Sequence, residues 1–404
     1  MTDTNDEFAF NPFDPAQTQH MWDLMARMRA EAPVTRPTEG FVYLASHADN
    51  KAAFRDAKRL SSAEGFRAPG VVVPDEESFL GEIDPPLHTN VRRFLLRAFT
   101  IQTAAAVEPW TRDFVRRCLG RVVDAGGGDL LPMLCVPIPG AVTGHSLGLP
   151  EDQLERVAEL CNELLHSTWP QMNATDDGVG IGGAFPELAE IIDTAIAEHR
   201  AAGDDAPDDL LTRMIRAEAD GQRLSDLHIR TLAVNSVAGS LSLTYMLGNL
   251  LHRFITDEEG FTSKLRADRG LIPMAVEESL RFEPPVLFLF RTAKEDVELG
   301  GCPVHQGERI ITGIASANRD ETVWEHADEY RLDREALPDN HLSFGEGPHL
   351  CLGNHLTRMI GRVVLEEAID QFAPGQLRLA EGYELHLVPM FLEYGPDSLD
   401  VVVG

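Results

Sequence analysis

The chain lacks the patterns that mark several large classes of protein. It has no Cys-x-x-Cys pair, and its five cysteines, an odd number spread over 404 residues, argue against a disulfide framework or a zinc knuckle. No window offers the ~20 apolar residues of a membrane span. The first thirteen residues are acidic and lack the basic and apolar regions of a signal peptide. We therefore expect a soluble, cytoplasmic protein without a membrane segment.

Positive charge is also scarce. The chain has 35 lysines and arginines against 65 aspartates and glutamates, which gives a formal net charge of −30. Nucleic-acid binding depends on clustered cations that replace counterions on phosphates, and no basic run is present. We therefore exclude nucleic acid as a partner and read most of the acidic charge as a solubility feature.

Linkers and internal repeats are absent as well, so residues 1–404 are expected to form one unit with two unequal lobes. Apolar periodicity predicts a mainly helical protein with a smaller β part. The expected helices cover residues 15–31, 47–58, 88–99, 103–123, 152–168, 185–202, 208–218, 226–255, 271–281 and 354–372. A β-rich lobe is expected from about residues 30–60, 286–312 and 377–403.

One stretch, residues 343–353, places a single cysteine among glycines in the order Ser-Phe-Gly-Glu-Gly-Pro-His-Leu-Cys-Leu-Gly. Glycine permits positive φ and close approach of a flat ligand to the backbone. The expected helix follows at once, and the N–H groups at a helix start favour a negatively charged sulfur. Cys351 is therefore predicted to be either a nucleophile or a metal ligand, and this stretch alone leaves both open.

Two further patterns lie on expected helices. Glu278 and Arg281 are three residues apart, so they share a helix face and can pair, although such a pair alone is usually a weak surface contact. Ala238 and Gly239 remove side-chain bulk from the middle of a long helix. That gap indicates either close helix packing or room for a ligand, and a kink there would free a backbone carbonyl.

Four cation candidates recur beside apolar or glycine-rich segments. They are His88, Arg92, Arg291 and His349. Each one taken alone is better explained as an ordinary solvated or hydrogen-bonded residue. Together they could hold the carboxylates of a flat, anionic cofactor.

These residues, taken in order, resemble a bacterial cytochrome P-450, a member of the haem-thiolate monooxygenase family. The family's cysteine signature, F-G-x-G-x-[H/R]-x-C-x-G, is matched at every fixed position by Phe344, Gly345, Gly347, His349, Cys351 and Gly353. The family's E-x-x-R motif is matched by Glu278 and Arg281. Further matches are Asp84-Pro85-Pro86 with His88 and Arg92, the string Ala317-Asn318-Arg319-Asp320, and Tyr330 with Arg334.

The resemblance implies a fold, a cofactor and a set of roles. The fold is the family's triangular helical prism, with haem b between the long distal helix and the cysteine loop. Cys351 would be the axial ligand of the haem iron. His88, Arg92, Arg291 and His349 would hold the haem propionates, and Phe344, Gly345, Gly353, Ala238 and Gly239 would lie against the haem. Glu278, Arg281 and Arg334 would form a buried structural network.

The chain departs from the family at the distal helix. The usual string is A-G-x-[D/E]-T, in which the acid and the threonine help to deliver protons during oxygen activation. Here the string is Ala238-Gly239-Ser240-Leu241-Ser242, so leucine replaces the acid and serine replaces threonine. Ser242 would keep a hydroxyl for the relay, whereas Leu241 has no proton to give. The protons would then come from water, Ser242, a substrate hydroxyl or another side chain.

The resemblance favours an enzyme, a monooxygenase that activates O2 and oxidises, most simply hydroxylates, a medium-sized hydrophobic substrate through an altered proton relay. A peroxide-using or nitric-oxide-reducing haem-thiolate enzyme and a non-catalytic haem-binding ligand sensor are the alternatives. The distal helix lacks the arginine expected of a peroxide user, and no output domain is present for a sensor. Positions that line the family's pocket correspond to Phe66, Val71, Val72, Val237, Leu241, Val286, Leu289, Met390 and Phe391.

No reductase is fused to the haem segment, so electrons are expected from a ferredoxin and its flavin-dependent reductase, with the enzyme itself a monomer. Family ferredoxins are acidic, and so is this chain. Docking would therefore need a local basic patch on the thiolate face. The arginines predicted to form it are Arg92, Arg93, Arg97, Arg116, Arg117 and Arg358.

Overall fold

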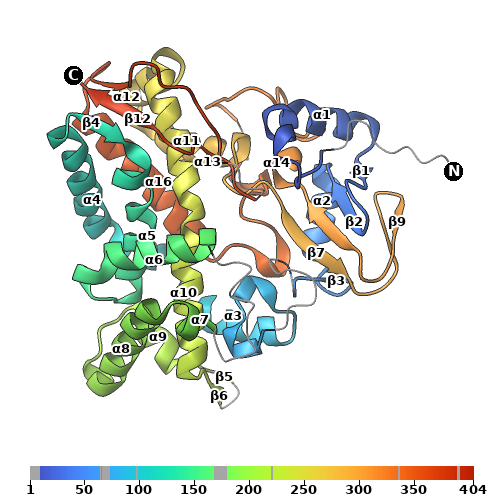
Figure 1. Ribbon diagram of the computed structural model, residues 1–404, viewed down its shortest axis with the longest axis horizontal. Coiled ribbons are helices and arrows are strands. Elements are labelled where there is room, and N and C mark those ends of the chain that lie inside the picture. Colours follow the sequence, from blue (N-terminus) through green and yellow to red (C-terminus); the bar gives the residue numbers. More distant parts are fainter. Residues whose placement is uncertain are drawn as a thin grey trace. The chain divides into compact units, whose positions relative to one another are not determined.

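The computed structural model describes residues 10–63, 65, 73–96, 99–167, 180–219, 222–334, 337–388 and 392–404 (Figure 1). The chain divides into two compact units. The first comprises residues 1–66, 274–351 and 387–395, and the second comprises residues 67–273, 352–386 and 396–404. Each unit is therefore assembled from segments that are distant in the sequence.

The first unit is built on a five-stranded sheet with the strand order β1-β2-β10-β7-β3. Its strands are β1 (Val34–Thr35), β2 (Phe41–Leu44), β3 (Leu60–Ser61), β7 (Leu289–Ala293) and β10 (Arg309–Thr312), with the hairpin β8 (Val297–Leu299) and β9 (Cys302–Val304). Its helices are α1 (Met21–Glu31), α2 (His47–Arg55), α14 (Ile314–Ala317), α15 (Leu337–Asn340) and, from residue 274 on, α13 (Ile272–Phe282). Strand β10 runs parallel to β2 and antiparallel to β7.

Both faces of this sheet are buried, because alternate residues of a strand point to opposite sides. Tyr43 and Ile311 join a core with Met21, Met25 and Met28 of α1. The methionines are spaced i, i+4 and i+7, which confirms the predicted apolar face of this helix. A second core on the other side contains alternate residues of the same strands, among them Val42, Leu44 and Ile310.

The second unit is mainly helical. Its helices are α3 (Leu87–Leu96), α4 (Ile101–Asp124), α5 (Pro137–Leu147), α6 (Leu154–Ser167), α7 (Gly180–Ala184), α8 (Pro186–Ala202), α9 (Leu210–Arg216), α10 (Asp226–Ser240), α11 (Ser242–Thr256), α12 (Ser263–Ala267) and α16 (Asn354–Gln371). Helix α10 packs against α5, α6, α8 and α9, and α16 packs along α4. Figure 1 shows α10 and α11 following one another in yellow along one line.

Helix α5 was not among the predicted helices. Pro139, Gly140 and Gly144 lie within it and disfavour a helix by intrinsic propensity. All of its residues except His145 are buried, so it has no polar face to produce a helical period. A Cβ added to Gly140 would lie 2.3 Å from the Cβ of Ala158, which shows how closely α5 and α6 approach. Packing therefore overrides propensity in this segment.

Of the segment 377–403 that was predicted for the β-rich lobe, only residues 387–395 belong to the first unit, and the prediction is wrong for residues 377–386 and 396–403, which belong to the helical unit. Strand β12 (Asp400–Val403) lies between β11 (Leu377–Leu379) and β4 (Gly127–Asp129) and pairs with both in the helical unit. Gly127 has a φ of 128°, and a Cβ there would lie 2.1 Å from the carbonyl oxygen of Val401. The partner strand is thus a glycine-rich segment that carries no strand signal in the sequence.

Candidate active site

The cysteine loop has the glycine-dependent geometry that its sequence predicts. Gly345 and Gly347 have φ values of 68° and 69°, a region that side chains disfavour. The N–H of Cys351 donates to the carbonyl of Phe344 at 2.8 Å, which closes the loop. The Cys351 residue is partly exposed. In this it differs from Cys118, Cys135 and Cys161, which are buried.

Gly347 is also required by a close approach within the first unit. A Cβ at this position would lie 2.9 Å from the carbonyl oxygen of Phe54 and 3.1 Å from the Cα of Arg55, at the end of α2. The Arg55 guanidinium donates to the Glu346 carboxylate at 2.9 Å. The loop is therefore attached to α2 through both backbone packing and an ion pair.

Glu278 and Arg281 form a buried ion pair rather than the surface contact that their spacing alone would suggest. Both side chains are 0% exposed, and Arg281 Nε and Nη2 each donate to the Glu278 carboxylate at 2.7 Å. The remaining Arg281 donors bond the carbonyls of Asn318, Ala327 and Glu329. Arg334 Nε donates to Glu278 at 2.9 Å. The structure thus brings together the three residues of the expected network.

Asn318 extends this network to the cysteine loop. Its carbonyl accepts from Arg281, its Nδ2 donates to Ser343 Oγ at 2.8 Å, and its Oδ1 accepts from the Leu342 N–H at 2.7 Å. Ser343 Oγ donates onward to the carbonyl of Leu280 at 2.6 Å. Sequence reasoning noted the string that contains Asn318 but gave this residue no role.

The four cation candidates fall into two pairs. Arg291 and His349 belong to the first unit with Cys351, whereas His88 and Arg92 lie four residues apart on α3 of the second. Arg291 is 6% exposed, with its guanidinium 5.3 Å from the Phe54 ring centre and Nη1 donating to the Phe290 carbonyl. His88 is 1% exposed. Cations this deeply buried need anionic or hydrogen-bonding partners.

The expected long helix over residues 226–255 is interrupted at Leu241. The Leu241 N–H donates to the carbonyl of Ala238 at 3.1 Å, and the Thr244 N–H donates to the carbonyl of Leu241 at 2.9 Å. These i→i+3 bonds replace helical i→i+4 bonds at the junction. Gly239 is exposed, and a Cβ added there would meet no atom within 4 Å. The helix therefore offers an open backbone surface at the predicted ligand-facing position.

Leu241 itself is 2% exposed. A Cβ placed on Gly140 of α5 would lie 3.7 Å from Leu241 Cδ2, so the leucine side chain approaches α5 where that helix has no side chain. This location favours helix packing as the role of Leu241, and its place in a substrate pocket stays a prediction. Ser242 Oγ donates to the carbonyl of Gly239 at 3.2 Å.

The structure describes only some of the other residues that were predicted to line the substrate pocket. Phe66, Val71, Val72, Met390 and Phe391 lie outside the described residues. Val237 is fully buried. Val286 and Leu289 are partly buried against a core that includes Phe54 and Leu342.

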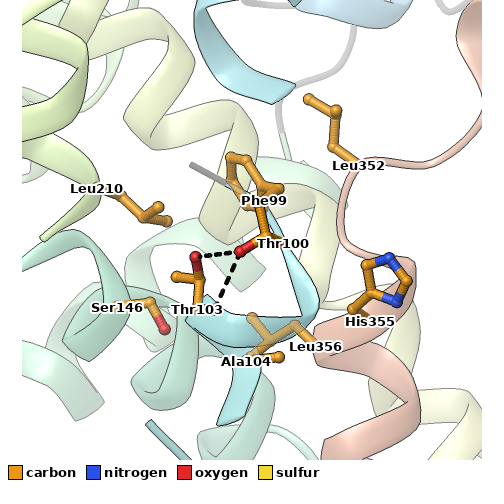
Figure 2. A pocket seen from close by; sticks show the side chains of 9 residues that line it. All are labelled: Phe99, Thr100, Thr103, Ala104, Ser146, Leu210, Leu352, His355 and Leu356. Carbon is orange, nitrogen blue, oxygen red and sulfur yellow. Dashed lines mark hydrogen bonds between the residues drawn. The ribbon is translucent and has the colours of Figure 1, made fainter. Parts of the chain in front are cut away.

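A small cavity within the second unit opens beside Leu352, the residue after the cysteine (Figure 2). It is lined by Phe99, Thr100, Thr103, Ala104, Ser146, Leu210, Leu352, His355 and Leu356. Figure 2 shows Thr100 Oγ1 bonded to the Thr103 side chain and to the Thr103 N–H. The cavity has about 10 Å³ for the centre of a water molecule, so it is too small for a substrate. Burial lowers the pKa of His355 on this wall, and the charge of Arg358 lowers it further.

The predicted basic patch is weaker than its sequence suggests. Arg116 Nε donates to Glu367 at 2.7 Å, and its Nη1 approaches Asp113 at 3.4 Å. The Arg117 guanidinium lies 3.9 Å from Glu151. Arg97 lies outside the described residues. Much of the positive charge of this set is therefore balanced within the protein.

Each unit, taken by itself, has residues that suit part of a haem group. In the first unit, the partly exposed Cys351 follows a glycine loop with no side chain at Gly345 or Gly347, and the buried Arg291 suits a carboxylate. In the second unit, Gly239 leaves open space on a helix surface and His88 is buried. Residues 38–375 match the family model described as Cytochrome P450.

The chain belongs to the cytochrome P450 family. This P450 is 32% identical to the erythromycin C-12 hydroxylase of Saccharopolyspora erythraea over 355 residues, which cover 87% of this chain and 86% of the relative. It is 31% identical to the cyclomarin C epoxidase CymV of Salinispora arenicola over 364 residues, covering 89% and 90%.

Solved structures agree with the fold. A mutant of P450 EryK in complex with erythromycin B has a TM-score of 0.82 at 30% identity, covering 96% of this chain and 97% of that one. The CYP109E1 structure from Bacillus megaterium in complex with testosterone has a TM-score of 0.81 at 26% identity, covering 98% and 100%. The predicted mainly helical P450 fold is confirmed.

Family membership also confirms the cofactor and the reaction class. P450 enzymes bind haem b, and this chain is a monooxygenase of that family, which uses O2, a hydrophobic substrate and redox partners. Relatives named for hydroxylation and epoxidation represent two outcomes of the same oxygen chemistry. Across the described residues, no helix has both the length and the apolar character needed to cross a membrane.

Proposed function

We propose that this P450 hydroxylates or epoxidises a medium-sized hydrophobic substrate, with Cys351 as the axial thiolate. The observation that carries the proposal is the cysteine loop, in which the partly exposed Cys351 follows two positive-φ glycines and the Asn318–Ser343 hydrogen bond holds the start of the loop. When bound, the haem supplies oxygen activation, and thiolate ligation favours O–O cleavage. The relatives named for oxidising erythromycin and cyclomarin C support a sizeable, largely apolar substrate.

His88, Arg92, Arg291 and His349 are proposed to bind the haem propionates. The burial of Arg291 supports this role, because a buried cation gains most from a carboxylate partner, and His88 is buried too and can donate a hydrogen bond. Phe344, Gly345, Gly353, Ala238 and Gly239 are proposed to lie against the macrocycle. Gly239 is suited to that role since nothing within 4 Å would meet a Cβ there.

The spectrum of the reduced protein with carbon monoxide tests the ligation. The band should appear at the position characteristic of thiolate ligation. A band at the position typical of histidine ligation, in haem-loaded protein, would refute the role of Cys351.

The proton relay is proposed to depend on Ser242. Its hydroxyl donates to the Gly239 carbonyl at 3.2 Å, so it must break that bond before it can pass its proton on, and its oxygen can then accept a proton from water. Leu241 carries no exchangeable side-chain proton. Replacing Ser242 by alanine should raise the peroxide released per electron consumed, because protonation would then depend on water alone.

Leu241→Asp tests whether the missing acid limits the reaction. Leu241→Asn is the matched control, since it has nearly the same shape without a carboxylic acid. We expect more product per electron from the aspartate variant than from the asparagine variant. Equal yields would show that another proton path already serves this P450.

A ferredoxin with its reductase is proposed as the electron source. Arg93 is exposed on α3 and is the described member of the predicted patch that best suits docking to an acidic partner. Arg93→Glu should slow ferredoxin-driven reduction and weaken its dependence on salt. Arg27→Glu reverses a charge on α1 and should leave both unchanged. Equal effects of the two substitutions would exclude docking at Arg93.

A further inference from the structure

The side chain of Asn235 lies on α10, one helical turn before Gly239. Its Oδ1 accepts a hydrogen bond from the N–H of Leu80 at 3.2 Å. Leu80 begins a short 3₁₀ turn, Leu80–Glu82, in the same unit. An N–H group can donate only to the amide oxygen, so this contact determines which way the amide faces.

The Asn235 amide nitrogen is left with two N–H donors. Among the residues that the structure describes, neither donates to an acceptor, and the side chain is only partly exposed. Because the side chain is partly exposed, these two donors can be reached by water or by a ligand. The serine hydroxyls on the same helix, in contrast, do have hydrogen-bond acceptors within the protein.

The hydroxyl groups along α10 donate within their own helix. Ser236 Oγ donates to the Leu232 carbonyl at 2.7 Å, and Ser240 Oγ donates to the Val237 carbonyl at 2.7 Å. A ligand lying along this helix would therefore find these hydroxyls already committed as donors. The Asn235 amide, in contrast, still has N–H groups that can donate to a ligand.

Asn235 also shares a helix face with the open position. Residues 235 and 239 have the spacing i and i+4 within α10, which places them on one side of this helix. At a rise of 1.5 Å per residue, Asn235 stands about 6 Å along the helix from Gly239. The open space at Gly239 is the proposed position of the haem, so a substrate that lies beside the haem along α10 meets the Asn235 amide one turn away.

We infer that Asn235 orients the substrate by donating a hydrogen bond to an oxygen acceptor, such as a carbonyl, ester or hydroxyl group. The preferred substrates of this P450 are then oxygen-bearing molecules rather than pure hydrocarbons. Most residues assigned to the pocket are apolar, so one directed donor has a large influence on which way a ligand lies. This inference rests on the proposed oxidation of a medium-sized hydrophobic substrate beside the haem.

Two probes of matched ring size test the inference. Cyclododecanone and cyclododecane differ by one carbonyl, and the dissociation constant of each is measured in haem-loaded protein from the change in ferric absorbance. The wild type should bind the ketone about three- to tenfold more tightly than the hydrocarbon, as one neutral hydrogen bond allows. The ratio of the two dissociation constants is compared between variants, because a substitution that weakens the binding of both probes equally leaves this ratio unchanged.

Asn235→Asp is the decisive variant. It keeps an oxygen acceptor for the Leu80 N–H and removes both donors, so the ratio should fall to about one. Asn235→Leu removes the donors and the Leu80 contact and serves if the aspartate variant does not fold. Ser236→Ala, which removes a neighbouring hydroxyl bonded within the helix, should keep the wild-type ratio.

The possible results distinguish a failure of the Asn235 inference from a failure of the proposed function. An unchanged ratio in Asn235→Asp, or no ketone preference in the wild type, would overturn the inference and leave the amide bonded to water only. The carbon monoxide spectrum of each variant is recorded in parallel. A thiolate band with an unchanged ratio refutes Asn235 alone, whereas a missing band in the wild type refutes the proposed function.

Discussion

The cysteine loop and the α10–α11 junction are held in different ways. The loop is connected to a fully buried ion pair through Arg281, Asn318 and Ser343, and each link is a directed hydrogen bond. The junction at Leu241 is held by apolar packing near Gly140 and by hydroxyls bonded to their own helix. Directed networks tolerate few substitutions, whereas apolar packing accepts many side chains of suitable volume.

This difference explains where the chain keeps the family pattern and where it departs. Every fixed position of the cysteine signature is present, and several of them have a structural role: Gly345 and Gly347 have positive φ, Gly347 also makes a close approach, and Phe344 and Cys351 are joined by a backbone hydrogen bond. The acid of the distal helix is replaced by Leu241, whose side chain approaches a helix with no side chain at Gly140. The substitution is thus absorbed by packing rather than by a new polar network.

Removal of Cys351 should have the largest effect. Cys351→Ala deletes the sulfur, so the carbon monoxide band of thiolate ligation should vanish completely. Cys302→Ala is the matched control because Cys302 is the other partly exposed cysteine among the described residues. The control should keep the full band, and loss of the band in both variants would point to a general effect on folding.

Glu278→Gln should be the most destabilising of the remaining changes. It leaves the Arg281 charge buried at 0% exposure without its carboxylate, which costs about 3–5 kcal/mol. Unfolding in urea gives the free energy. Glu31→Gln removes a partner from the exposed Arg27–Glu31 pair, where both side chains are 53% exposed, and should cost less than about 1 kcal/mol. Similar losses of unfolding free energy in the two variants would show that the contribution of an ion pair to stability here does not depend on its burial.

Leu241→Asp should lower the free energy of unfolding by about 3 kcal/mol, because it removes buried apolar volume and places a carboxyl in an apolar junction. Leu241→Met conserves the volume and should cost less than about 1.5 kcal/mol. The same urea measurement applies to both. A small loss for aspartate would mean that the junction contains water or a polar partner.

The smallest expected effect concerns Glu108, whose ion pairs are partly rather than fully buried. Hydrogen bonding to Arg362 lowers the pKa of Glu108, with Arg112 adding to the effect. A lowered pKa in the folded state means that this stabilisation is present above the unfolded pKa and is lost as pH falls through the folded value. Glu108→Gln should cost about 1 kcal/mol at pH 7. The difference from wild type should shrink on acidification, as urea midpoints at pH 7 and pH 3 would reveal.

The sequence predicts the cysteine loop well because its chemistry is local. Gly345, Gly347 and the Cys351 N–H act within ten residues, so a motif captures them. Arg281 and Glu278 are three residues apart and are equally readable. That they are buried, and connected through Asn318, depends on residues some 40 positions away, which spacing does not reveal.

The sequence does not predict the elements and contacts whose formation depends on packing between segments that are distant in the chain. Helix α5 contains prolines and glycines that argue against it, and its burial by other helices overrides them. Strand β4 is glycine-rich and forms only because β12 pairs with it. The open face at Gly239 follows from a small residue, but the Leu80–Asn235 contact joins residues 155 positions apart and leaves no local signal.

The division of the chain into two units also has a consequence for how the protein is made. Residues 387–395 complete the first unit and residues 396–404 complete the second. During synthesis, neither unit can reach its final set of contacts until these last segments have left the ribosome. The cysteine loop is therefore translated well before the scaffold around it is finished. We expect the nascent chain to depend on chaperones until then, since incomplete domains expose apolar surface.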